Sequence, residues 1–487
     1  MRWLLTSVAL AIVAVPTGAF AQAQAQSISA SDKKTGAQAH PQLVQEYGGA
    51  MRGLAAAYVE RVGRRISVQS GLSNSERDFT VTLLDSPVNN AFAIPGGYVY
   101  VTRGLLALMN DEAELASVLG HEVGHVAARH AAKRQQTSTI TQVLAGIVGA
   151  AAGNSGLGSL VGRGAGMGAD LITKGFSRSQ EYQADDLGVR YLASAGYDPE
   201  ASSDMLAILA AQGDLETRTT GKNSGVPTWA STHPNSADRV VRADQKARAT
   251  GAAGRGDRNR DALLNAIDGL PYGDDPSKGF VEGREFKLPQ QRLAFTVPQG
   301  FTLANGDDAV TISGQSGQAK FQGGKVGMGG LDDYIGQVFA RLTSGGVRHG
   351  AIQAGRAAKG EAGGIEMRYA FGQASSNAGT LDVGVFAYRP DGSGDAYSFV
   401  TLAPAGRGIG PFQGLVESVR RMTPDEAARV KALKVRVVTV KAGDTPQTLA
   451  RQMAFADFQL ERFLTINGMT DKDSLRPGDR VKLIVRG

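Results

Sequence analysis

The five residues His121-Glu122-Val123-Gly124-His125 constrain this chain more than any other segment, because their chemistry depends on a helix. Residues i and i+4 lie one above the other on a helix face, about 6 Å apart, so two imidazoles can converge on one metal ion. Glu122 follows the first imidazole and can act as a general base on a metal-bound water. The flanking residues are apolar and predict a partly buried helix: Leu115, Val118, Leu119 and Val126. The pattern favours a catalytic metal site over two histidines on a polar surface helix.

Two glycines accompany the histidine pair. Gly120 and Gly124 each cost about 1 kcal/mol relative to alanine in a helix interior. Such a cost beside candidate ligands predicts that another element packs closely against this face.

A third protein ligand must come from elsewhere if one metal position is to stay open for water. Glu181 and Asp185 are again i and i+4, at the start of the next predicted helix. One carboxylate can bind the metal while the other orients a ligand histidine or handles a proton. The alternative is a solvated acidic helix start, which the helix dipole also favours.

Composition limits what else can hold a metal. The chain has 487 residues, no cysteine and six histidines. Disulfides, thiolate metal sites and cysteine nucleophiles are therefore excluded, and a metal must be held by histidine, carboxylate or backbone oxygen. The net charge is only +6 and no block of five like charges occurs, so nucleic acid is not an expected partner.

The N-terminus predicts a secretory signal peptide over residues 1–21. Arg2 precedes an apolar run to Val15, and Ala19-Phe20-Ala21 supplies a small-residue cleavage signature. The run is shorter than the roughly 17–25 residues of a membrane span, which argues against an uncleaved anchor. No cysteine is available for lipid attachment. We expect the mature chain to act in the periplasm or at the cell envelope.

Periodicity predicts an α+β fold with several units. Residues 22–265 should form a mostly helical domain with a small sheet, in which the histidine helix runs to about Ala132. Residues 266–425 become rich in glycine, with short strand-like runs and helical stretches at 331–342 and 411–421, and predict a small α+β domain of open role. A charged helix over 424–434 should then lead to a terminal unit over 435–487.

The uncharged segment 135–162 contains six glycines, which weaken any membrane-spanning helix. We expect a lid beside the cleft, with contact to lipid as the alternative.

Several motifs resemble the gluzincin metallopeptidase family, which includes HtpX, the CAAX prenyl endopeptidases and the periplasmic protease BepA. His121–His125 followed by Glu181-x-x-Ala184-Asp185 matches its metal motif. The segment 90–105 resembles its edge strand, and Ser231-Thr232-His233-Pro234 with Asp238-Arg239 resembles its downstream motif. The resemblance covers roughly residues 40–245. It implies a zincin fold with one Zn²⁺ held by His121, His125 and Glu181, with Glu122 as base and Asp185 as accessory acid.

The downstream motif leaves two roles open. Arg239 or His233 can stabilise the oxyanion of a tetrahedral intermediate, because developing charge is best met by fixed donors. We expect His233 instead to occupy the open zinc position in a resting enzyme. For both residues the alternative is a structural hydrogen bond in a surface loop.

The strand Tyr98–Thr102 is a candidate edge to which an extended substrate peptide adds by main-chain hydrogen bonds. His130 is at i+5 from His125, off the metal face, and we expect a structural role for it. His40 and His349 have no partners in sequence and receive the same interpretation.

Residues 435–487 show a strand–helix–helix–strand pattern that resembles a LysM domain, a family that binds N-acetylglucosamine polymers such as peptidoglycan. The sequence departs from that family at Pro446 and at Ile484-Val485. A small docking module without sugar affinity is the alternative.

Taken together, these features predict an exported zinc metalloendopeptidase that cleaves misfolded or unassembled envelope proteins. A zinc-bound water, deprotonated by Glu122, attacks the peptide carbonyl, and Glu122 passes the proton to the leaving amine. Expected partners are polypeptide substrates, peptidoglycan and outer-membrane assembly machinery. Two alternatives stay open: a non-catalytic chaperone-like scaffold anchored to peptidoglycan, and a wall hydrolase acting on peptide crosslinks.

Overall fold

The structure is a computed structural model. It describes residues 27–72, 74–131, 175–220, 229, 233, 237–305, 309–314, 316–342, 347–356, 365–376, 379–390 and 394–487. The predicted signal peptide and the segment 135–162 lie outside these residues and stay predictions. Among the described residues, no helix is long and apolar enough to cross a membrane.

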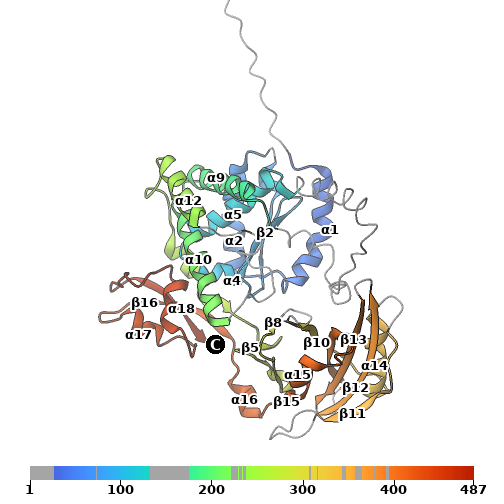
Figure 1. Cartoon of the computed structure of the whole chain (residues 1–487). Coiled ribbons are helices and arrows are strands. Elements are labelled where there is room, and N and C mark those ends of the chain that lie inside the picture. Colours follow the sequence, from blue (N-terminus) through green and yellow to red (C-terminus); the bar gives the residue numbers. More distant parts are fainter. Residues whose placement is uncertain are drawn as a thin grey trace, which may run out of the picture.

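The N-terminal half is a helical body around a small sheet, as the sequence predicts (Figure 1). The sheet contains β1 (Thr80–Leu84), β3 (Tyr98–Thr102) and β2 (Ala91–Ile94), in that spatial order. The helices are α1 (Ala30–Glu46), α2 (Leu54–Ser67), α3 (Ser75–Asp78), α4 (Arg103–Leu108), α5 (Glu112–Ala127), α9 (Arg178–Ser194), α10 (Ala201–Thr220), α12 (Ala237–Ala249) and α13 (Arg260–Ile267).

The sheet order corrects one expectation. β3 lies in the middle, parallel to β1 on one side and antiparallel to β2 on the other, so it has no free edge for a peptide. A tight turn at Gly96 and Gly97, both with positive φ, returns the chain from β2 to β3. A side chain at Gly97 would lie 2.1 Å from the Asp78 carbonyl oxygen. The open edge next to β3 therefore belongs to β2.

Helix α5 is buried along almost its whole length. Asp111 caps its start, because the Asp111 side chain accepts a hydrogen bond from the Glu114 backbone N–H at 2.9 Å. Glu114 accepts from the Asn110 N–H at 2.6 Å instead of the N-cap N–H, so the two residues do not form a reciprocal capping box. The helix ends at Ala127, earlier than the predicted Ala132, and Arg129 adopts a left-handed conformation with φ 56°.

Residues 280–421 form two packed sheets. A four-stranded sheet has the order β15-β7-β6-β5, and a seven-stranded sheet has the order β11-β12-β13-β14-β10-β9-β8. The strands are β5 (Phe280–Glu282), β6 (Glu285–Leu288), β7 (Leu293–Thr296), β8 (Thr302–Asn305), β9 (Val310–Gly314), β10 (Gly317–Lys325), β11 (Gln353–Arg356), β12 (Glu366–Ser376), β13 (Gly379–Arg389), β14 (Asp395–Pro404) and β15 (Arg420–Arg421). One face of the larger sheet packs on the smaller sheet and the other on α14 (Gly330–Arg341).

Two helix predictions near this region are too long. The predicted helix 411–421 becomes a short α15 (Gln413–Glu417) followed by β15, and the helix 424–434 ends early as α16 (Pro424–Arg429). From Leu433 the alternation of Leu433, Val435 and Val437 takes over and forms a strand.

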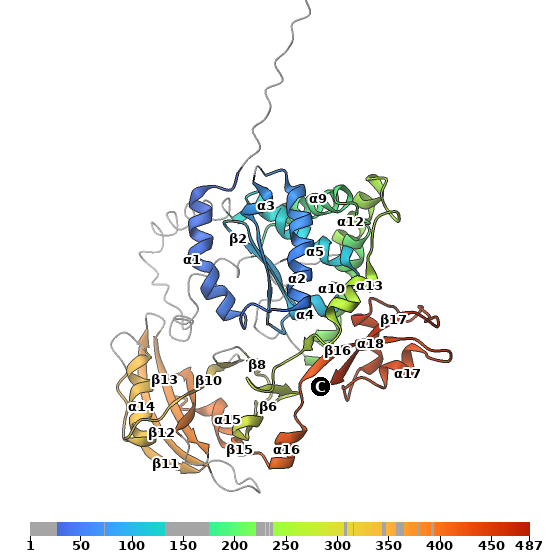
Figure 2. The same ribbon diagram turned by 180° about the vertical axis from the view of Figure 1, so that it is seen from behind.

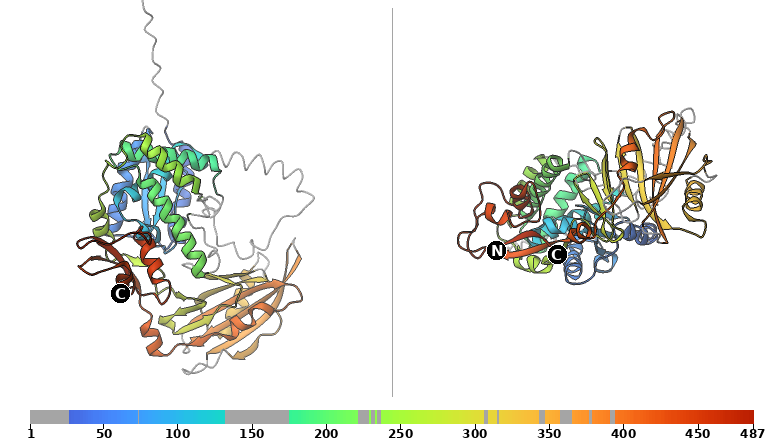
Figure 3. Two further views of the ribbon diagram at one scale, coloured as in Figure 1. Left: turned by 60° about the vertical axis from the view of Figure 1, so that its left-hand side comes forward. Right: turned by 90° about the horizontal axis from the view of Figure 1, so that it is seen from below.

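The C-terminal module contains β16 (Leu433–Thr439), α17 (Pro446–Ala450), α18 (Gln459–Ile466) and β17 (Arg480–Arg486), so the predicted strand–helix–helix–strand order is present. A short strand β4 (Pro271–Tyr272) pairs with β16. The module lies against α10 and α13 in two views (Figures 2 and 3). Its apolar side chains belong to the same core as those of α2 and α5. The domain boundaries stay predictions.

Candidate metal centre

Helix α5 places His121 and His125 on one face, toward α9. Their Nε2 atoms lie 3.0 Å apart, and both side chains are buried. Two imidazole nitrogens this close in a buried position can share a proton or bind one cation between them, and imidazole is a common zinc ligand.

Helix α9 supplies the carboxylate. Ser177 and Gln180 form a complete capping box that fixes where α9 begins, and Glu181 follows directly. The two Glu181 oxygens lie 3.5 Å from His121 Nε2 and 3.6 Å from His125 Nε2. Burial acts to raise the pKa of Glu181, but attraction to His233 and hydrogen bonds from His121 and His233 outweigh it and hold the pKa well below its usual range. The carboxylate is therefore charged and available as a ligand.

Glycines allow the two helices to approach. A side chain at Gly188 of α9 would lie 3.2 Å from the His121 backbone nitrogen, and one at Gly124 would lie 3.2 Å from the Ala184 carbonyl oxygen. This contact explains the glycines predicted to mark close packing.

His233 completes a group of four. Its Nδ1 lies 3.0 Å from Glu181 Oε1 and 3.2 Å from His121 Nε2. One ligand atom from each of His121, His125, Glu181 and His233 lies within 4.8 Å of the others, and all four residues are buried. The Trp229 ring stacks on His233 with centroids 4.3 Å apart and fixes the imidazole.

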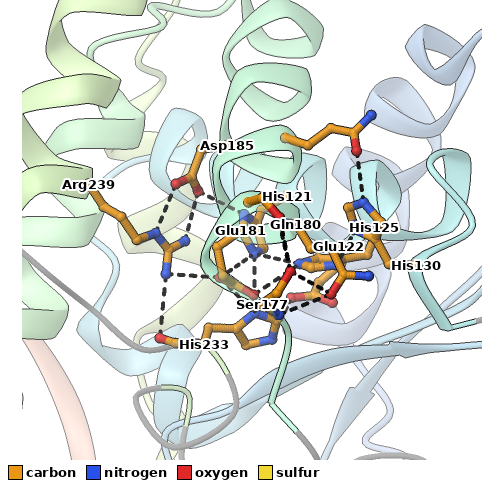
Figure 4. Close-up of polar contacts among 12 residues, drawn as sticks. His121, Glu122, His125, His130, Ser177, Gln180, Glu181, Asp185, His233 and Arg239 are labelled. Atoms are coloured by element: carbon orange, nitrogen blue, oxygen red, sulfur yellow. Dashed lines mark hydrogen bonds and ion pairs between the residues drawn. The ribbon is translucent and has the colours of Figure 1, made fainter. Parts of the chain in front are cut away.

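Glu122 faces the same group from α5 (Figure 4). Both of its carboxylate oxygens are buried and make no hydrogen bond within the described part of the chain. The nearest charge partner is His233 Nε2, 3.5 Å from Oε1. Burial raises the pKa of the Glu122 carboxyl. An unpaired buried carboxylate is costly, so its presence beside two imidazoles and a second carboxylate fits a site built for a cation and a water.

The donor set identifies the cation. Two nitrogens and one carboxylate oxygen suit Zn²⁺, and three protein ligands are the number found at catalytic zinc sites. The His121–His125–Glu181 cluster thus fits one Zn²⁺.

Asp185 and Arg239 support the centre from behind. Asp185 Oδ1 accepts a hydrogen bond from His121 Nδ1 at 2.9 Å, which leaves Nε2 of that ring free for a metal. Arg239 donates to both Asp185 oxygens at 2.8 Å and lies 3.0 Å from Glu181 Oε2. Its guanidinium is 1% exposed and turned toward these carboxylates.

All seven residues proposed from the sequence thus lie together: His121, Glu122, His125, Glu181, Asp185, His233 and Arg239. His40 and His349 lie elsewhere, on Tyr100 and Phe339 respectively. Trp229, Phe176 and Gln183 were missed. Phe176 stacks on His125 with centroids 4.0 Å apart, and Gln183 contacts His130, which itself contacts His125. The only sequence signal for Gln183 is its place between Glu181 and Asp185.

The comparisons agree with this geometry. Residues 54–247 match the model of Peptidase family M48, and the matched segment contains His121, His125, Glu181 and His233, whose ligand atoms lie together.

Among curated relatives, the chain is 33% identical to the mitochondrial metalloendopeptidase OMA1 of Schizosaccharomyces pombe over 222 residues, 44% of this chain and 60% of that one. It is 34% identical to the beta-barrel assembly-enhancing protease of Yersinia pestis over 169 residues, 33% of each chain. The Escherichia coli protein of the same name is 30% identical over 203 residues, 40% of this chain and 39% of that one. The chain thus spans between a third and three fifths of these relatives.

Proposed function

We propose that the whole protein is an exported zinc metalloendopeptidase that cleaves misfolded or unassembled envelope proteins. The observation that carries the proposal is the position of Glu122, whose two buried carboxylate oxygens face the candidate metal ligands, with His233 Nε2 3.5 Å from Oε1. Support for the envelope comes from the N-terminal signature and from relatives named beta-barrel assembly-enhancing proteases.

Each residue of the metal centre has a separate role in this proposal. His121, His125 and Glu181 would hold Zn²⁺, which supplies a Lewis acid that polarises the peptide carbonyl and acidifies water. Glu122 takes the proton of the attacking water, because burial makes its carboxylate more basic than an exposed one. Glu122 then delivers that proton to the leaving nitrogen. Asp185 holds His121 in the tautomer that presents Nε2.

We propose orienting roles for Asp185 and Arg239. The bidentate contact of Arg239 with Asp185 commits the guanidinium to fixing carboxylates, which favours this role over oxyanion stabilisation.

Substrate would bind in extended form along β2. This strand pairs with β3 on one side only within the described residues, and it packs against α5 near Glu122. Main-chain pairing gives affinity with little sequence selection, which suits unfolded polypeptides.

His233 would act as a removable fourth ligand in the resting enzyme. Its Nδ1 lies within 3.2 Å of both Glu181 oxygens and of His121 Nε2, where an attacking water would otherwise stand.

The C-terminal module would bind peptidoglycan. Its strand–helix–helix–strand order supports the LysM resemblance. Co-sedimentation of the mature protein with purified peptidoglycan tests this, with N-acetylglucosamine oligomers as competitor. If added peptidoglycan does not change the amount of protein left in the supernatant, peptidoglycan binding is contradicted.

Glu122→Gln tests the enzyme against the scaffold alternative. We expect casein hydrolysis to fall by about 10²–10⁴, the usual worth of a general base, while one zinc per chain is retained by metal analysis. The matched control is Glu60→Gln, because Glu60 is half exposed on α2 and pairs only locally with Arg64. Equal hydrolysis by wild type and Glu122→Gln would refute the proposed activity.

A further inference from the structure

The two ligand histidines are supported differently. His121 donates from Nδ1 to the charged carboxylate of Asp185, whereas His125 Nδ1 lies 2.9 Å from another imidazole nitrogen, Nδ1 of His130. His130 is fully buried, and its Nε2 lies 3.1 Å from Gln183 Oε1 on α9. The mechanism above does not use His130 or Gln183.

The position of His130 depends on an unusual backbone. If α5 continued, a residue at i+5 from His125 would point away from the metal face. The helix instead ends at Ala127, and Arg129 has φ 56°. A non-glycine residue in this left-handed region is uncommon and strained. The turn brings the His130 ring edge-on to His125, with centroids 4.9 Å apart (Figure 4).

The direction of each hydrogen bond follows from the metal. His125 Nε2 lies among the other ligand atoms, so a bound zinc takes its lone pair there and the proton stays on Nδ1. His130 Nδ1 must then accept that proton's hydrogen bond. The His130 proton is therefore on Nε2 and is donated to Gln183 Oε1, which can only accept.

We infer that His130 and Gln183 form a neutral relay that fixes the Nδ1–H tautomer and ring orientation of His125 for zinc. Both are positioning residues, since neither reaches the metal cluster. The relay ties His125 to α9, the helix that also supplies Glu181, so both supports of the histidine pair come from one helix. Phe176 covers His125 with a stacked ring, whereas Gln183 at the other end of the relay is exposed. The inference rests on the zinc centre of the proposed function.

The test measures zinc affinity without substrate, by competition with a fluorescent chelator on the full mature protein. His130→Phe keeps a ring of similar size but removes the acceptor for His125 Nδ1–H. We expect its Kd for Zn²⁺ to rise by about 10–100-fold, the usual effect of losing a partner of a ligand histidine. The matched control, His349→Phe, changes a histidine of the small domain and should leave the Kd within twofold.

Two further variants address Gln183. Gln183→Leu removes the acceptor for His130 Nε2–H and should weaken zinc binding, whereas Gln183→Glu keeps an acceptor and should retain the wild-type Kd within about threefold. If His130→Phe does not fold, the comparison of Gln183→Leu with Gln183→Glu still tests the relay. Equal losses in both Gln183 variants would contradict the relay.

A spectroscopic measurement separates positioning from general stability. In ¹⁵N-histidine NMR of the zinc form, we expect the His125 proton on Nδ1 and the His130 proton on Nε2. His130→Phe should speed exchange of the His125 proton with water while the melting temperature in chelator changes little. A His130 proton on Nδ1, or an unchanged Kd in a folded His130→Phe protein, would overturn the inference. Activity loss in Glu122→Gln is independent of this result.

Discussion

At the scale of one residue, the His233 ring lies where the proposed mechanism needs room for substrate and water. Its imidazole fills the side of the cluster opposite His125, stacked on Trp229 and within hydrogen-bond distance of Glu181. The same imidazole lies 3.5 Å from Glu122, the proposed base. Under the proposed function, a substrate and its water need that space, so His233 would have to leave for each reaction.

Substitution His233→Ala should therefore raise casein hydrolysis several-fold, because the blocking ring is gone. Zinc affinity should fall modestly, since one of four candidate ligands is lost while three remain. Both are measured on the same preparation, by peptide release and chelator competition. Lower hydrolysis with unchanged zinc content would show that His233 takes part in catalysis instead.

Residue identities at the centre were predictable because i and i+4 spacing fixes a shared face on any helix. The shared faces of His121 with His125 and of Glu181 with Asp185 follow from that rule. The choice of Glu181 as the third ligand, and the inclusion of His233 and Arg239, came instead from the family resemblance. The contact between His130 and His125 was not predictable. It depends on a helix end at Ala127 and a left-handed Arg129, and residues 125–134 contain no glycine or proline that would indicate either.

At the scale of elements, the centre is a contact between α5 and α9. Each helix contributes ligands, and the distance between the helices sets whether those ligands meet. Gly188 approaches the His121 backbone so closely that an added methyl carbon would stand 3.2 Å from its nitrogen and 3.4 Å from the Gly120 carbonyl carbon. The ligand geometry therefore depends on Gly188, a residue with no side chain that could bind the metal.

Gly188→Ala should push the helices apart and weaken zinc binding, at a cost of about 1–3 kcal/mol in unfolding free energy. Urea denaturation and chelator competition measure the two effects. Gly213→Ala on α10 is the control: nothing lies within 4 Å of its added carbon, so helix propensity alone should stabilise the protein by up to about 1 kcal/mol. Unchanged zinc affinity in Gly188→Ala would show that the helices accommodate the added methyl group without displacing the ligands.

Periodicity predicts the individual helices and strands of the helical body. It does not predict which of these elements lie next to one another. Alternation marks β2 and β3 as strands, yet whether a strand is central or at an edge depends on which partner arrives from elsewhere in the chain. Here β1 pairs in parallel with one side of β3, while the Gly96-Gly97 turn joins β2 to the other side and leaves β2 at the edge of the sheet. In the small domain, β10 is rich in glycine and lacks a clear pattern, and much of the seven-stranded sheet was not predicted in detail.

At the scale of the whole molecule, the C-terminal module is built into the helical body. Lys482 of β17 is fully buried, and its Nζ donates to the carbonyl oxygens of Ala107 at 2.8 Å and Met109 at 2.6 Å. These carbonyls end α4, just before the helix that carries the histidines. Around them, Arg260 donates to the Arg480 carbonyl oxygen, and Gly269 and Leu270 exchange backbone hydrogen bonds with Val435.

Lys482→Ala should lower the unfolding free energy by about 2–5 kcal/mol, because two buried carbonyls lose their donor and a cavity replaces the side chain. Lys472→Ala, at an exposed position in the same module, should change it by less than about 0.5 kcal/mol. Urea unfolding followed by tryptophan fluorescence compares them. A loss below 1 kcal/mol for Lys482→Ala would show that the module adds little to the body.

The Lys482 contact also forms late during synthesis of the chain. The chain emerges from the ribosome from its N-terminus onward, and 375 residues separate Ala107 from Lys482. The Lys482 contact with the end of α4 can therefore form only after residue 482 has emerged. Under the proposed function, a protease that cleaves unfolded polypeptide is a hazard to its own unfinished chain. Late formation of this contact would delay a competent metal centre until synthesis has moved past residue 482.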